Sequence, residues 1–230
     1  MGLNLISFGP REVTAASAMP AVVSAPSHNK LIVRGFRASR LSLRWVDWRL
    51  GLLEQATKDV DALHGDAKNI RLTVLRKSFS RDIAVLSDKL RTSQNPLSAD
   101  FRQALQKALQ LIRRNIYEKG LIVDEGTAGR CDPNLWGGGM PFAAATPGSP
   151  EPRISVCAAW FSMNADLHRD VITHEFFHLI GLFDQPLIAS TADAFNDANT
   201  MAQLVASIHD RNRWEDSSGL AKPTHAYPAP

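Results

Sequence analysis

Two histidines and a glutamate occur together at a spacing that suits metal chemistry. The sequence His174-Glu175-Phe176-Phe177-His178 lies in a segment with the apolar pattern of an amphipathic helix. Residues four apart lie on one helix face, so both imidazoles could bind one cation. Glu175 projects about 100° away around the helix, where it could take a proton from a metal-bound water. The spacing predicts one Zn²⁺ ion, with His174 and His178 as ligands and Glu175 as general base.

A catalytic zinc site needs a third protein ligand. Asp184 lies six residues after His178, and Gly181 between them lets a helix end and the chain turn back. Asp184 is therefore the expected third ligand, and Asp193, at the start of the next predicted helix, is the alternative. The plainer alternative is that Asp184 caps a turn and that the histidines lie on a solvated helix face.

Helices are the main elements that must position these side chains. Apolar spacing predicts helices over 41–63, 98–119, from Asn164 or Asp166 to about Leu182, and over 190–210, with strands at 121–124 and 153–161. The stretches 137–152 and 222–230 are rich in proline and predict loops. The expected organisation is a leader or linker without fixed structure at 1–35, one domain at 36–221 and a flexible tail at 222–230.

The surroundings of the histidines carry a family resemblance. The apolar stretch 153–161 contains Cys157 and ends in Trp160-Phe161, and Thr173 leads directly into His174. Downstream stands Asn196-Asp197-Ala198-Asn199, followed by an apolar helix pattern. Over about 130–210 the chain resembles the aspzincin metallopeptidases, the group that includes deuterolysin and the fungal lysine-specific endopeptidases.

This resemblance implies a zincin-like, helix-rich α+β domain with a small sheet whose edge strand borders the active-site cleft. The cleft strand would lie near 153–158, antiparallel to a bound peptide. The resemblance also implies an aspartate as third zinc ligand. Cys131 stands where the family often places the disulfide partner of the second cysteine, here Cys157.

One part of the family pattern is missing. The segment Gly-Thr-x-x-Asp-x-x-Tyr-Gly supplies the family's aspartate and oxyanion-stabilising tyrosine, but Gly181-Leu182-Phe183-Asp184 stands here, and no tyrosine follows until Tyr227. The Gly-x-x-Asp spacing instead looks like the metzincin arrangement, in which Met201 would form the Met-turn. His209 is a candidate oxyanion donor in place of the tyrosine, and a satisfied or exposed helix histidine is the alternative.

Composition limits the classes of partner. The net charge is only +3 in 230 residues, and basic spots such as Arg113-Arg114 are isolated pairs, so no nucleic-acid partner is predicted. No apolar run is long enough to span a membrane. Nothing indicates an oligomeric state.

The resulting hypothesis is a zinc endopeptidase acting on protein or peptide substrates. Bacterial members of the family that the chain resembles are often effector or toxin domains. Together with the lack of a clear Sec signal, this resemblance implies a protein that is cytoplasmic before export and is secreted or delivered by a specialised secretion system. The alternatives are a degenerate zincin that binds without hydrolysis and a metzincin-like peptidase with the same site.

Overall fold

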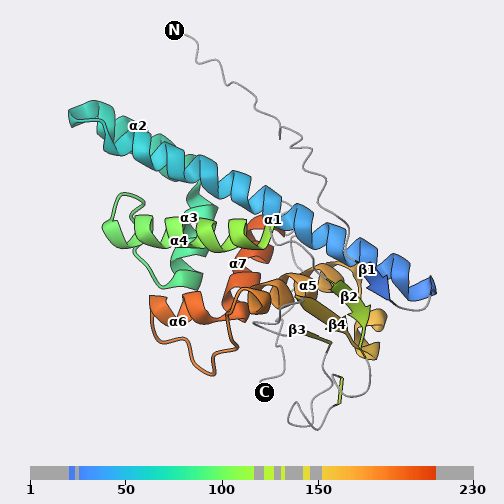
Figure 1. The fold of residues 1–230 in the computed structure, drawn as a ribbon. Helices are drawn as coiled ribbons and strands as arrows, with labels where there is room; N and C mark the ends of the chain where they lie inside the picture. Colours follow the sequence, from blue (N-terminus) through green and yellow to red (C-terminus); the bar gives the residue numbers. More distant parts are fainter. Residues whose placement is uncertain are drawn as a thin grey trace, which may run out of the picture.

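Helices make up most of the described chain, with a small sheet at one end (Figure 1). The computed structural model describes residues 21–23, 26–116, 122–126, 131–132, 142–145 and 152–210. The helices are α1 (Pro26–Asp61), α2 (Gly65–Ser78), α3 (Ser80–Leu90), α4 (Ala99–Ile116), the 3₁₀ helix η2 (Ala158–Ser162), α5 (Ala165–Leu179), α6 (Thr191–Asn196) and α7 (Ala198–His209). The strands are β1 (Ala21–Val23), β2 (Ile122–Glu125), β3 (Ala143–Ala145) and β4 (Arg153–Val156). The expectation of a helix-rich α+β chain with a small sheet is confirmed.

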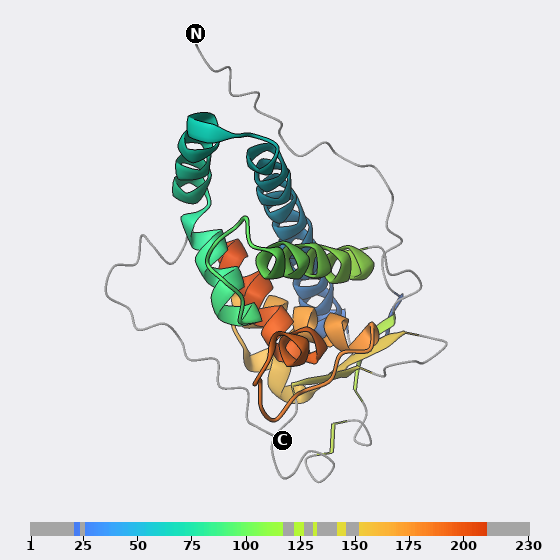
Figure 2. The ribbon, with the colours of Figure 1, turned by 90° about the vertical axis from the view of Figure 1, so that its left-hand side faces the viewer.

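The long helix α1 forms one side of the core. Its buried apolar side chains recur at intervals of three, four or seven residues, and its inner face packs on α4, α5 and α7. Figure 2 shows α2 running alongside the end of α1 that lies away from the sheet. At Gly35 an added Cβ would lie 2.9 Å from the buried ring of Trp160, so glycine permits the close approach of η2 to α1.

The expected leader boundary at residue 35 is wrong. Helix α1 begins at Pro26, a residue type accepted in the first turn of a helix, and Ile32 is fully buried. The apolar pattern before residue 41 is interrupted by Arg34, Arg37 and Arg40, which hid the helical period. Residues 1–20 and the expected tail 222–230 lie outside the described residues.

The sheet has the order β1-β2-β4-β3, in which only β3 is antiparallel to its neighbour. Strand β4 therefore lies inside the sheet, and the expectation that 153–158 is the cleft strand is wrong. The edge strand next to β4 is β3, which falls in the stretch predicted as a loop. Its sequence is Ala-Ala-Ala, which has low strand propensity, so pairing with β4 decides its conformation.

The helix predicted over 190–210 is two helices. Ser190 caps α6 through a capping box with Asp193, and Asp197 caps α7 by accepting a hydrogen bond from the Thr200 N–H. Asn164 caps α5, which confirms the first of the two predicted starts. Helix α5 ends at Leu179 rather than near Leu182. These caps fix the directions of the helices that carry or flank the histidines.

Candidate metal centre

Helix α1 fixes the rotation of α5 about its own axis. The Thr173 hydroxyl lies 2.8 Å from the Ser39 hydroxyl of α1, and the Phe176 ring packs edge-on against Phe36. His174 and His178 therefore point away from α1, because each lies about 100° or more around the helix from Thr173. They face the segment that follows α5 instead.

Three side chains converge on that side of α5. His174 Nε2 and His178 Nε2 lie 2.9 Å apart, and the Asp184 carboxylate oxygens lie 3.4 Å from the first nitrogen and 3.5 Å from the second. All three ligand atoms lie within 4.8 Å of one another, and no other group of three or more such residues occurs in the described part of the chain. The structure thus brings together the two predicted histidines and the preferred third ligand.

The orientation of His178 is set by a backbone carbonyl. Its Nδ1 lies 2.9 Å from the Leu182 carbonyl oxygen, which can only accept a hydrogen bond. The Nδ1 proton is therefore assigned, and Nε2 points toward His174 and Asp184, where it carries a second proton when no cation is bound and would offer its lone pair to a bound cation. Two imidazole nitrogens and a carboxylate aimed at one point require a shared proton or a cation between them, and this donor set suits zinc.

The charges of the three side chains depend on one another. Burial, together with the positive charge on His178, lowers the pKa of His174 to about 4. Burial also acts to lower the pKa of His178, but its interaction with Asp184 and the charge of Glu175 raise that pKa to about 9. Although burial opposes it, the two histidines lower the pKa of Asp184. Asp184 is thus held as an anion that can bind a cation.

Glu175 sits beside this cluster and contacts the sheet. Its carboxylate accepts a hydrogen bond from the backbone N–H of Ala145 in the edge strand β3, while Oε2 has no hydrogen-bond partner among the described residues. Burial raises the pKa of Glu175 to about 7, and the nearby charge of Asp184 adds to the rise. A carboxylate with a pKa near neutrality can both accept and release a proton. The link to Ala145 had no signal in the sequence, since β3 is a run of alanines.

The segment that carries Asp184 is fixed by α7. Gly181 has a φ of +94°, which turns the chain out of α5. Phe183 pairs with the start of α7: its N–H donates to the Asn196 carbonyl, and its own carbonyl accepts from the Ala198 N–H. The buried carboxylate of Asp197 accepts from the Gln185 N–H at 3.0 Å. Asp184 is held between these contacts.

Asp197 is a positioning residue that the sequence analysis missed. The available signal was the spacing from Asp197 to Thr200, which is typical of a helix N-cap. Assigning a cap there would have divided the helix predicted over 190–210 into two helices.

The remaining candidates lie elsewhere. Asp193 forms the capping box of α6 and is not in the metal group. His209 Nδ1 lies 2.8 Å from Asp210 and 3.2 Å from Arg169, and its ring packs edge-on against Trp45, so the structure does not bring it to the ligands as an oxyanion donor. Met201 is buried within α7 and forms no turn, which contradicts the metzincin-like role.

Cys131 and Cys157 form a disulfide bond. Cys157 follows β4 directly, and its N–H donates to the Phe142 carbonyl just before β3. An added Cβ at Gly126 would clash with the Cys131 sulfur, so this glycine makes room for the bridge. The bridge thus lies beside the start of β3, and Ala145, which contacts Glu175, lies at the other end of this short strand.

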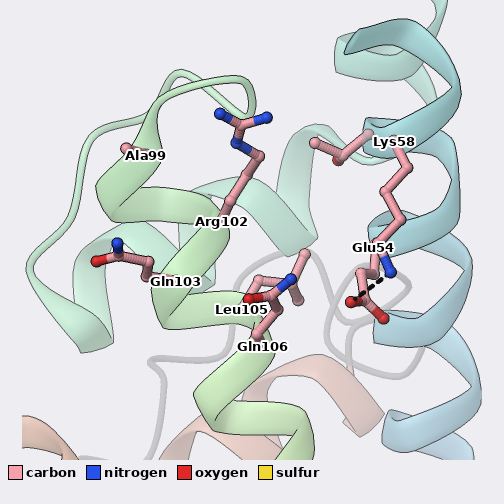
Figure 3. A pocket seen from close by; sticks show the side chains of 8 residues that line it. Glu54, Lys58, Ala99, Arg102, Gln103, Leu105 and Gln106 are labelled. Atoms are coloured by element: carbon pink, nitrogen blue, oxygen red, sulfur yellow. Dashed lines mark ion pairs between the residues drawn. The ribbon is translucent and has the colours of Figure 1, made fainter. Parts of the chain in front are cut away.

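A surface hollow between α1 and α4 lies apart from the metal group. Figure 3 shows its lining, in which Glu54 and Lys58 form an ion pair. Arg102, which also lines it, pairs with Asp61. Its charged groups thus already form ion pairs, and His174, His178 and Asp184 are not among the residues that line it.

Comparisons with known proteins do not assign a family or a function to the chain. No family model, curated protein or solved structure matches the chain. Within the described residues, no helix combines the length and apolar character needed to cross a membrane. Function must therefore be argued from the geometry and chemistry of the residues around α5.

Proposed function

We propose that the protein is a zinc endopeptidase with a zincin-like fold. The observation that carries this proposal is the convergence of His174, His178 and Asp184 on one point, with the buried carboxylate of Glu175 beside it. Two imidazoles and one carboxylate leave a fourth coordination position for water or substrate, as in catalytic zinc sites. A zinc ion held there would lower the pKa of a water molecule to about 7 and polarise a carbonyl group.

The chain's own residues then have distinct roles. Glu175 takes a proton from the attacking water and transfers it to the leaving amine. Its hydrogen bond to Ala145 keeps the carboxylate at the edge of the sheet. The outer edge of β3 pairs with no other described strand, so an extended peptide could add there and place its scissile carbonyl near Glu175. This geometry favours a protein or peptide substrate.

The disulfide supports action in an oxidising compartment. Such bonds form and persist outside the reducing cytosol. We propose that the protein acts after export, in keeping with the effector or toxin role expected from the family resemblance. Detection of active protein only in the medium or in target cells would support this. Activity confined to the cytosol of the producing cell would contradict it.

A non-catalytic module is the second candidate. The direct contacts of Asp184 with both histidines favour it, since the three side chains can satisfy one another without a metal. His209, the candidate oxyanion donor, is also engaged elsewhere. This candidate predicts either no stoichiometric zinc or zinc without hydrolysis.

Elemental analysis, together with hydrolysis of labelled casein, tests the proposal. The wild type should hold about one zinc per chain and cleave the substrate, and a chelator should abolish cleavage. His174→Ala should lose the zinc, and Asp184→Ala should bind it more weakly. Asp193→Ala is the matched control, because it removes a carboxylate from the next helix and should retain the metal. Wild type without zinc after reconstitution would refute the proposal.

A further inference from the structure

Four basic side chains form a row along the outer face of α1. Lys30, Arg34, Arg37 and Arg44 are all exposed, and none makes an ion pair with a described residue. Their spacings of four, three and seven residues place them within about 40° of one line parallel to the helix axis. In the sequence they look like isolated charges, but the helix aligns them.

The row has no acidic counterpart on the same part of α1. Residues 26–52 contain six basic residues and one acid, Asp47, which pairs with Arg113 of α4 at 2.7 Å. The other two basic residues are used inside the fold. Arg40 donates to the last carbonyls of α4, and Arg49 pairs with the buried Asp82. The outer face of this segment is therefore strongly positive, although the whole chain carries only +3.

Apolar side chains continue along the same line. Leu41 is 63% exposed, Trp48 39% and Leu52 40%, and Leu41 stands between Arg37 and Arg44. Leucine and tryptophan favour the boundary between lipid headgroups and acyl chains, where nearby arginine and lysine can reach phosphate. A convex helix face with this mixture offers no groove for a peptide.

The row faces away from the metal site. The inner face of α1 contacts α5 through Ser39 and Phe36, and His174 and His178 lie on the far side of α5. Figure 1 shows α1 along one side of the molecule, with α5 below it. A molecule docked through the outer face of α1 would keep the metal site open to solvent and to a substrate.

We infer that the outer face of α1 binds a membrane surface rich in anionic phospholipids. Charge complementarity supplies the attraction, and Leu41, Trp48 and Leu52 supply shallow insertion. The apolar side chains interleaved with the cations favour lipid over nucleic acid, whose phosphates are met by basic and small polar groups. The inference does not depend on the proposed peptidase activity.

Vesicle sedimentation of the full chain tests the inference. At about 0.1 M salt, the protein should sediment with equal mixtures of phosphatidylcholine and phosphatidylglycerol, remain unbound with phosphatidylcholine alone, and be released at about 0.5 M salt. The variant Arg34→Gln, Arg37→Gln, Arg44→Gln should bind at least about tenfold more weakly. Leu41→Gln should weaken vesicle binding roughly threefold, without changing the salt concentration dependence of that binding.

The control removes the same charge elsewhere. Arg71→Gln, Lys77→Gln, Arg114→Gln takes away three exposed cations that make no ion pair with a described residue, and it should bind like the wild type. Equal loss in both triple variants would show a net-charge effect and overturn the inference. So would absence of vesicle binding, equal binding to neutral vesicles, or tighter binding to duplex DNA at the same salt.

Discussion

At the scale of single residues, Glu175 combines two properties that a proton carrier needs. Burial makes its charged form costly and raises its pKa to about 7. The hydrogen bond from the Ala145 N–H holds the carboxylate in place without supplying a proton that it could exchange. A glutamate on a solvated helix face would show neither property, so the burial of Glu175 excludes that plainer alternative.

Glu175→Gln should separate binding from catalysis. The amide oxygen can still accept from Ala145, so the side chain keeps its shape and its contact, but it cannot take a proton. We expect casein hydrolysis to fall by at least about 100-fold with the zinc content unchanged. Glu54→Gln, in the distant hollow between α1 and α4, should leave the rate unaltered. Equal rates in Glu175→Gln and wild type would remove Glu175 from the mechanism.

At the scale of elements, the sequence predicted those whose pattern is local. The His-Glu helix, its Asn164 cap and strand β2 follow from apolar periodicity and cap chemistry, and all three occur close to their predicted bounds. The convergence of His174, His178 and Asp184 was predictable for the same reason, since the two histidines lie one helix turn apart and Asp184 follows a turn-forming glycine.

Elements determined by long-range contacts were not predictable. Strand β3 has no strand pattern of its own, and its conformation depends on pairing with β4. The sequence therefore predicted a loop over 137–152 and gave no sign of the strand that contacts Glu175. The place of the Asp184 segment depends on the Asp197 carboxylate, which accepts a hydrogen bond from the Gln185 N–H twelve residues earlier in the chain. Such contacts join residues far apart in the chain and leave little trace in local periodicity.

Asp197→Ala should weaken zinc binding although Asp197 is not a ligand. The substitution removes the hydrogen bond that fixes Gln185 next to Asp184. We expect the zinc affinity, measured by competition with a chromogenic chelator, to fall about tenfold. Asp193→Ala is the matched control, because it removes a comparable helix cap, with a cost of about 1 kcal/mol in stability, and should preserve affinity. A similar loss in both variants would assign the effect to general loosening of the segment.

At the scale of the whole molecule, α5 is surrounded by contacts on several sides. Helix α1 holds Thr173 and Phe176, β3 meets Glu175, and the Asp184 segment is tied to α7. The last tie is Arg169 of α5, whose guanidinium donates two hydrogen bonds to Asp210, at 2.8 and 2.6 Å, at the end of α7. The relative positions of His174, His178 and Asp184 therefore depend on how α5 and α7 pack together.

This α5–α7 tie makes stability depend on pH in the acid range. Burial opposes ionisation of Asp210, but hydrogen bonds from His209 and Arg169 outweigh it and lower its pKa from 3.8 to about 2. A carboxyl whose pKa is lower in the folded state stabilises the fold above its unfolded pKa. That contribution is fully present above about pH 4 and is lost as the pH falls toward 2.

Urea unfolding of wild type and Asp210→Asn at several pH values tests this linkage. Near neutrality the variant should be less stable by about 2 kcal/mol, which corresponds to the lowered pKa, and the difference should shrink below about pH 4. Comparing the two proteins at each pH cancels the titration of groups that they share. Asp166→Asn removes a half-exposed carboxylate 3.7 Å from the same arginine and should cost less than about 1 kcal/mol. A difference between wild type and Asp210→Asn that stays constant from neutral to acid pH would show that Asp210 acts through packing, and that its charge does not hold α7 to α5.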